Sequence, residues 1–141
     1  MLSPGSVIAA YAGLFVWSFL AATILPLASE PALIVLVRQG EPIWLLVTIA
    51  TIGNTAGACT TYGLARGAAA ALERRTKHRD RAAARLLERY GAPALLLSWV
   101  PLLGDAVVAA AGLIRINVAT FLVWTTVGKA ARYAIVAYAV R

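Results

Sequence analysis

Charged residues are scarce in this chain of 141 residues: only 13% are Asp, Glu, Lys or Arg, and 61% are hydrophobic. Soluble chains have about 25% charged and about 45–50% apolar residues. The composition therefore excludes an ordinary soluble domain, and its apolar content excludes a disordered chain. Acidic residues are the scarcest, six against 13 basic ones, which gives a formal net charge of +7. This combination is typical of an integral membrane protein with a basic face toward an anionic surface.

Cysteine is nearly absent, because Cys59 is the only one, and a disulfide-stapled domain is therefore excluded. The sequence also lacks the His, Cys and carboxylate spacing of a metal site. It shows no arrangement of nucleophile and base, and the run from Gly63 to Gly67 has no following Lys-Ser/Thr of a phosphate-binding loop. We expect no metal, no cofactor, no nucleic-acid partner and no enzymatic activity.

Long apolar runs are the first positive feature, since a helix crosses a membrane with about 20 apolar residues. The sequence predicts a first spanning helix over about Val7–Leu25, ended by Pro26. It predicts a second over residues 42–65 and a last one over residues 116–140, which contains two basic residues.

The helix over residues 42–65 carries small and polar residues. Two small-xxx-small pairs predict close approach of neighbouring helices, and they are formed by Gly53, Gly57, Gly63 and Gly67. Four polar residues on the same segment predict hydrogen bonds between helices, namely Asn54, Thr55, Thr60 and Thr61.

Two stretches do not fit simple spanning helices. Residues 26–40 contain two prolines and two charges in too little length to cross. Residues 92–115 contain two prolines, a glycine and Asp105 in mid-run. Because proline and glycine break helices and the freed backbone groups must avoid lipid, we expect broken, re-entrant helices in a cavity lined by protein.

The two stretches resemble each other, because PLASE at residues 26–30 and PLLGD at residues 101–105 share a P-L-x-x-acid pattern. In both, the acid is followed by an apolar run, an arginine and a long helix. We therefore expect one membrane domain over residues 1–141, with halves at about 7–66 and 92–141 on either side of segment 67–91.

This repeat predicts the direction in which each helix and hairpin enters the membrane. With the first helix running outward, the first hairpin would enter from outside, the helix over residues 42–65 would run inward, and the second hairpin would enter from the cytoplasm. The predicted fold class is an all-α integral membrane protein of transmembrane helices plus two opposed re-entrant helical hairpins as an inverted repeat, an arrangement found in transporters.

Charges inside a membrane usually face a cavity and pair with one another. Glu30 and Asp105 stand at the two breaks and are the predicted proton-carrying or gating groups. Arg66, Lys129 and Arg132 are the predicted binders of an anionic headgroup, because cations hold phosphate. The alternative is that these groups form structural salt bridges, such as Glu30–Arg132 and Asp105–Lys129.

Residues 66–89 hold eight basic residues against three acidic ones, and loops rich in Lys and Arg stay in the cytoplasm. A stripe with four-residue spacing predicts a basic amphipathic helix on anionic lipid, and it consists of Lys77, Arg81, Arg85 and Arg89. The alternative, compatible with the first, is that these charges only set the orientation.

Four strings resemble the DedA superfamily of small inner-membrane proteins (SNARE-associated or VTT-domain proteins), and most of all its YqaA-like branch. They are LPLASEPALIVLV, ATIGNTAGACTTYGLAR, RYGAPALLLSWVPLLGDAVVAAAGLIR and GKAARY. The resemblance implies two opposed re-entrant hairpins in a bacterial inner membrane. It also implies movement of lipids between leaflets, with undecaprenyl phosphate and phospholipids as cargoes and the proton-motive force as a driver in some members. Glu30 and Asp105 match the family's hairpin acids, and Arg132 matches its last-helix arginine. The chain is shorter than the larger members and lacks their arginine-proline motif after the second hairpin.

The expected function is movement of lipid or lipid phosphate between leaflets. The expected partners are anionic phospholipid or polyprenyl phosphate, with protons and a second copy of the chain as further candidates. Two alternatives remain: an ion-coupled transporter of small solutes, and a membrane interaction module that transports nothing.

Overall fold

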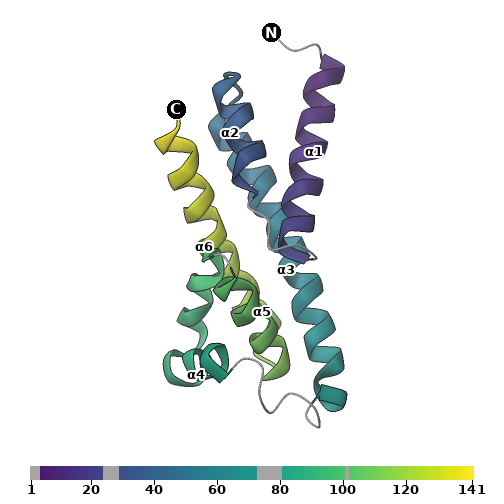
Figure 1. Ribbon diagram of the computed structural model, residues 1–141, viewed down its shortest axis with the longest axis vertical. Helices are drawn as coiled ribbons and strands as arrows, with labels where there is room; N and C mark the ends of the chain where they lie inside the picture. The colour runs from purple at the N-terminus through teal and green to yellow at the C-terminus, as the bar shows by residue number, and fades with distance from the viewer. Residues whose placement is uncertain (1–3, 24–28, 73–80, 101) are drawn as a thin grey trace.

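The computed structural model describes residues 4–23, 29–72, 81–100 and 102–141, and every regular element within these ranges is a helix (Figure 1). In chain order the elements are α1 (Pro4–Thr23), α2 (Glu30–Arg38), α3 (Ile43–Leu72), α4 (Arg81–Tyr90), the 3-10 helix η1 (Ala92–Trp99), α5 (Leu103–Leu113) and α6 (Val118–Ala139). The expectation of an all-helical chain is therefore confirmed for the described residues.

The predicted spanning helices correspond to the three longest elements. α1 and residues 43–69 of α3 are long and apolar enough to cross a membrane. α6 confirms the helix expected over residues 116–140, and the Asn117 side chain starts it by accepting a hydrogen bond from the Ala119 N–H at 2.9 Å. Pro26, the expected end of the first helix, lies outside the described residues.

Two glycines set the distance between α1 and α3. A Cβ at Gly53 would lie 2.6 Å from the Phe15 carbonyl oxygen, and one at Gly57 would lie 2.8 Å from the Ala22 Cβ. The backbones can approach this closely only because glycine has no side chain. Gly63 and Gly67 have open space where a Cβ would stand, so only the first of the two small-xxx-small pairs brings helices together.

The pairing also fixes the direction of α1. Gly53 faces Phe15 and Gly57 faces Phe19, so α1 and α3 run parallel. The expected topology, with the first helix running outward and the second inward, is therefore wrong. The physical reason is that α1 ends at mid-height and α2, about 13 Å long at 1.5 Å per residue, returns the chain to the end where α1 begins (Figure 1).

The stretch over residues 92–115 folds into two short helices, as its prolines and glycine predict. η1 rises from the α4 end to mid-height, and α5 runs back toward that end (Figure 1). Leu102 has a φ of +67° at the break between them. A Cβ at Gly104 would collide with the Ser98 carbonyl oxygen, so this glycine lets the two limbs approach each other.

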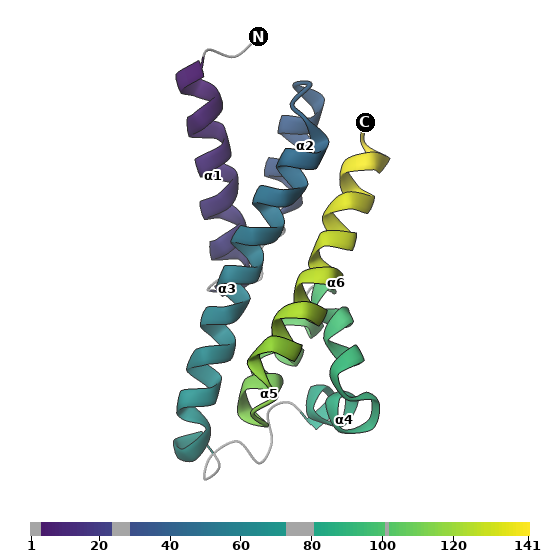
Figure 2. The ribbon, with the colours of Figure 1, turned by 180° about the vertical axis from the view of Figure 1, so that it is seen from behind.

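The two long helices α3 and α6 lie side by side and run in opposite directions, as the view from behind shows (Figure 2). η1 runs parallel to α6, because Gly128 faces Leu96 and Arg132 faces Trp99. One apolar core includes Leu14, Leu33 and Leu46. The other, nearer α4, includes Val107 and Phe121. The charged centre described below is built from residues of α2, α3 and α6.

We predict that Gly57→Ala lowers the free energy of unfolding by about 1–3 kcal/mol, because the added methyl group would push α1 away from α3. Gly63→Ala is the matched control, since its methyl group meets nothing and alanine favours a helix by about 1 kcal/mol. Thermal unfolding of both variants in detergent checks this. Equal midpoints for the two variants would contradict the close packing of α1 on α3.

Candidate functional site

The charged centre begins with an ion pair between the start of α2 and the middle of α6. Glu30 is the first residue of α2, where the positive end of the helix dipole favours a carboxylate. Its Oε1 atom pairs with the Arg132 guanidinium. The sequence left this pairing open as one of several, and the structure forms it. The side chains are 17% and 19% exposed, so the pair is reachable from outside the protein.

Arg132 has a second partner, and Glu30 has a free oxygen. The Arg132 Nη1 atom donates to the Trp99 carbonyl oxygen at 2.7 Å, so the end of η1 helps to hold the guanidinium. The Glu30 Oε2 atom is buried and has no hydrogen-bond partner among the described residues. One side of the carboxylate is therefore held by a cation, and the other is available to a donor.

A hydrogen bond between two hydroxyl groups joins the chain neighbours of the paired residues. The Ser29 Oγ and Tyr133 OH atoms lie 2.5 Å apart, so the residue before Glu30 is tied to the residue after Arg132. Tyr133 is 1% exposed, and its hydroxyl also lies near the side chains of Ser18 and Asn54. This arrangement fixes the start of α2 against α6.

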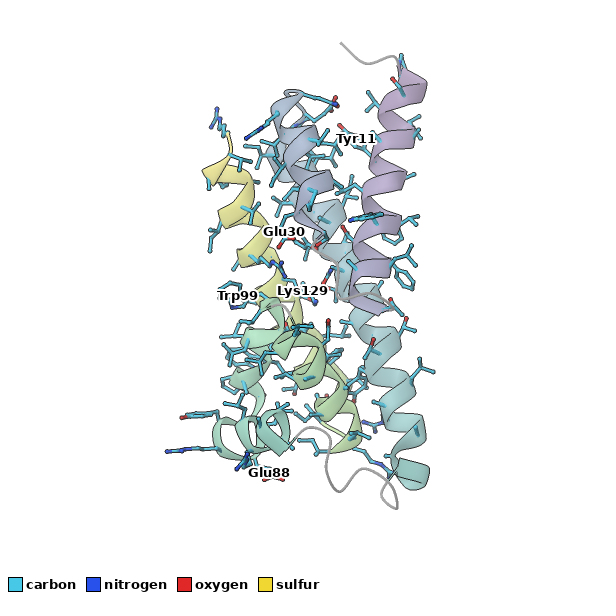
Figure 3. All side chains as sticks on the ribbon, viewed as in Figure 1. Tyr11, Glu30, Glu88, Trp99 and Lys129 are labelled. Carbon is cyan, nitrogen blue, oxygen red and sulfur yellow. The ribbon has the colours of Figure 1, made fainter. Side chains whose placement is uncertain are left out.

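Lys129 lies deeper, one turn before Arg132 on α6, and is only 4% exposed. Its Nζ atom donates to the Asn54 Oδ1 atom of α3. The Asn54 Nδ2 atom in turn donates to the Ser18 carbonyl oxygen of α1 at 3.0 Å. Asn54 therefore joins three helices and gives a buried ammonium a neutral acceptor. Figure 3 shows that Lys129 and Glu30 both lie at mid-height in the molecule.

Several buried hydroxyls around this centre have no hydrogen-bond partner among the described residues: Ser18, Thr51, Thr55, Ser98 and Thr125. Other threonines of the same helices satisfy their hydroxyls on the carbonyl four residues earlier, as Thr23 does at 2.7 Å and Thr48 at 2.7 Å. Thr51 lies one turn before Asn54 and Thr55, and Thr125 lies one turn before Lys129. The interior thus offers unused hydroxyl donors, one of them a helical turn from Lys129.

Asp105 occupies the first turn of α5, the position that matches Glu30 in α2. It is half-buried, and its charge lies close enough to that of Lys129 to interact. Lys129 hydrogen-bonds Asn54, however, and no direct ion pair joins it to Asp105 within the described residues. The alternative of an Asp105–Lys129 salt bridge is therefore not formed.

Arg66 lies elsewhere. Its Nη1 atom donates to the Tyr62 hydroxyl at 2.8 Å and to the Ile116 carbonyl oxygen at 3.3 Å, which ties the lower part of α3 to the α5–α6 connection. It stands twelve residues beyond Asn54 on α3, about 18 Å along the helix. The structure does not bring this predicted headgroup binder to the other two.

The basic stripe is described only in part. Lys77 lies outside the described residues, and Arg81 begins α4. Arg85 and Arg89 are exposed, and the Arg89 guanidinium lies 5.5 Å from the ring centre of Tyr90. The opposite face of α4 packs into the protein through Ala83 and Leu87, which are buried against α5 and η1. Much of the apolar face of this amphipathic helix is thus covered by the chain itself.

Ser29, Trp99 and Tyr133 were missed as site residues by the sequence reasoning. Ser29 and Tyr133 are the chain neighbours of Glu30 and Arg132, which is a signal that could have found them. Asn54 was expected to bond between helices, and it does so, but its role as the acceptor for Lys129 was not foreseen.

These features define a helical protein with membrane-length apolar helices around a buried charged centre. The model of the VTT domain family matches residues 25–141, and the chain therefore belongs to this family, the DedA family of membrane proteins. The resemblance seen in the sequence is confirmed.

Relatives support the same assignment. The chain is 41% identical over 127 residues to the inner membrane protein YqaA of Escherichia coli (strain K12), covering 89% of this chain and 87% of that protein. The inner membrane protein YqaA of Shigella flexneri matches to the same extent. An uncharacterized protein of Haemophilus influenzae is 39% identical over 128 residues, 85% of this chain and 80% of that protein. No solved structure matches the chain.

We predict that Asn54→Leu lowers the free energy of unfolding by about 1–3 kcal/mol, because it leaves the buried Lys129 ammonium without its acceptor. The double variant Asn54→Leu/Lys129→Met should recover most of this loss, since replacing both partners by apolar groups is nearly neutral. Chemical or thermal unfolding in detergent measures both. A double variant that is no more stable than Asn54→Leu would argue against this pairing.

Proposed function

We propose that the protein moves an anionic lipid, a phospholipid or a polyprenyl phosphate, between the leaflets of a bacterial inner membrane. One observation carries the proposal: an ion pair at mid-height, reachable from outside, stands next to a buried ammonium and unused hydroxyl donors. Guanidinium, ammonium and hydroxyl groups are the donors that recognise phosphate oxygens.

Arg132 and Glu30 act as a switch in this proposal. A lipid phosphate that reaches Arg132 competes with the Glu30 carboxylate for the same guanidinium. A proton taken up on the free Oε2 atom of Glu30 removes the competing negative charge and releases Arg132 for the phosphate. Proton uptake and lipid binding thereby favour each other, which is how a proton gradient would drive lipid movement.

Lys129 forms the inner part of the binding site. One of its three donors is used by Asn54, which leaves two for an oxyanion. The hydroxyl of Thr125 lies on the same face of α6. Asp105, whose charge interacts with that of Lys129, balances the ammonium when the phosphate has left.

An inverted repeat gives the site access to both leaflets. Three helix directions support it: α1 is parallel to α3, η1 is parallel to α6, and α3 is antiparallel to α6. In addition, Glu30 and Asp105 occupy the first turns of α2 and α5, the helices that follow the two breaks. The limbs are α1 and α2 in one half and η1 and α5 in the other. Such halves rock against each other around a central site in transporters.

Orientation follows from the basic segment. α4 lies at the opposite end of the molecule from the start of α1 and the end of α6 (Figure 1). With residues 66–89 in the cytoplasm, the start of α1 and the end of α6 lie on the outer side, and the exposed Arg85 and Arg89 face the anionic inner leaflet.

The test is translocation of a fluorescent phosphatidylglycerol in proteoliposomes, read leaflet by leaflet with a membrane-impermeant quencher. We predict that Arg132→Gln and Lys129→Gln each slow translocation about tenfold or more, since a lost charge-assisted hydrogen bond is worth about 1.5–3 kcal/mol. Arg115→Gln, at an exposed arginine outside the site, is the control and should translocate like the parent protein.

Folding is followed separately by unfolding midpoint, so that loss of transport is not confused with loss of structure. If the parent protein fails to move the lipid while remaining folded, the proposal is wrong. In that event an interaction module or a solute transporter becomes the better explanation.

A further inference from the structure

An apolar groove of about 450 Å³ runs between α1 and α2. Small residues of α1, Ala10 and Gly13, form part of its lining, and a Cβ at Gly13 would have open space around it. Trp17 and Val35 also line it and are 44% and 53% exposed, so the groove opens outward. Its size is that of a small-molecule site, which is about 300–1,000 Å³.

One end of the groove is formed by the residue next to the charged centre in the chain. Pro31 lines the groove and directly follows Glu30, whose carboxylate pairs with Arg132. From there the groove extends along α2 toward Val35 and along α1 from Trp17 to Ala10, a distance of about 10 Å at 1.5 Å per residue. The apolar groove therefore runs from the residue that follows Glu30, at the start of α2, toward the end of the molecule where α1 begins (Figure 1).

This geometry fits a molecule that joins a phosphate to a linear hydrocarbon chain. In a membrane the surrounding lipid is already apolar, so hydrophobic burial contributes little and a chain is held by close packing in a groove. A second copy of the protein would need a broad interface, about 1,200 Å² or more, and would make no use of the ion pair formed by Glu30, the residue before Pro31.

We propose that the α1–α2 groove holds one acyl or prenyl chain of the lipid whose phosphate lies at Arg132. The inference rests on the proposed function and extends it, because it assigns the tail as well as the headgroup. The protein then selects its cargo by two features, an anionic group at the ion pair and a flexible chain that fits beside Gly13.

The test uses the full chain in nanodiscs of phosphatidylcholine containing a trace of phosphatidylglycerol with a photoreactive diazirine in its acyl chain. Labelled peptides are identified by mass spectrometry. We expect labelling to concentrate at Trp17 and Val35, and to exceed that at Ile135, an exposed residue outside the groove. A diacylglycerol probe with the same chain but no phosphate should label the groove several-fold less.

Gly13→Trp fills the groove and should reduce its labelling several-fold. Gly63→Trp is the matched control, because Gly63 is also an exposed helical glycine with nothing near its Cβ position. Even labelling of all exposed faces, or unchanged labelling in Gly13→Trp, would overturn the inference. A shift of Gly13→Trp from dimer to monomer without a change in labelling would identify a second copy as the occupant and would also overturn it.

The labelling needs no transport, so the two proposals can fail separately. Groove labelling without translocation by the parent protein would reject the proposed function and keep the groove assignment. Translocation that Gly13→Trp leaves unchanged, together with unchanged labelling, would reject the groove assignment alone.

Discussion

The ion pair between Glu30 and Arg132 is the interaction on which the centre of this protein depends. A charge in apolar surroundings is costly unless it has a partner. The pair therefore requires the start of α2 and the middle of α6 to meet, and the end of η1 to come close enough for the Trp99 carbonyl to accept from Arg132. Elements from both halves of the chain converge on one guanidinium.

The rest of the packing makes this convergence possible. Glycines 53 and 57 let α1 lie directly on α3, which brings the Ser18 carbonyl within reach of Asn54 and so gives Lys129 a fixed acceptor. Gly128 plays the corresponding part for η1 on α6. Where ordinary apolar side chains would hold the helices apart, small residues allow polar groups of different helices to meet and satisfy one another.

Much of this could be predicted from residues alone. Proline and glycine marked the break over residues 92–115, and the matched acids identified Glu30 and its counterpart Asp105. The direction of α1 could not be predicted, because hydropathy gives the length of a helix and not which way it runs. Arg66 was grouped with the site because it is a cation, and a residue's charge does not tell how far it lies from other residues in space. Only the fold shows that Arg66 lies about 18 Å along α3 from Asn54.

The hydrogen-bond partner of Lys129 could not be predicted from the sequence either. A cation near a carboxylate suggests a salt bridge, yet helix register places the Asn54 amide, not Asp105, against the ammonium. The neutral partner leaves the ammonium's charge available, which is what an anion site needs. The two acids also differ in their partners. Glu30 forms an ion pair with Arg132, whereas Asp105 interacts with Lys129 only at longer range.

In the proposed function, lipid phosphate and the Glu30 carboxylate compete for Arg132. The most direct measurement is retention of phosphatidylglycerol by the purified protein, followed by native mass spectrometry over a range of pH. Glu30→Gln should retain more lipid than the parent protein at neutral pH and lose most of the pH dependence. Glu30→Gln/Arg132→Gln should retain little lipid at any pH. Equal retention by the parent protein and Glu30→Gln throughout the range would show that the carboxylate and the phosphate do not compete.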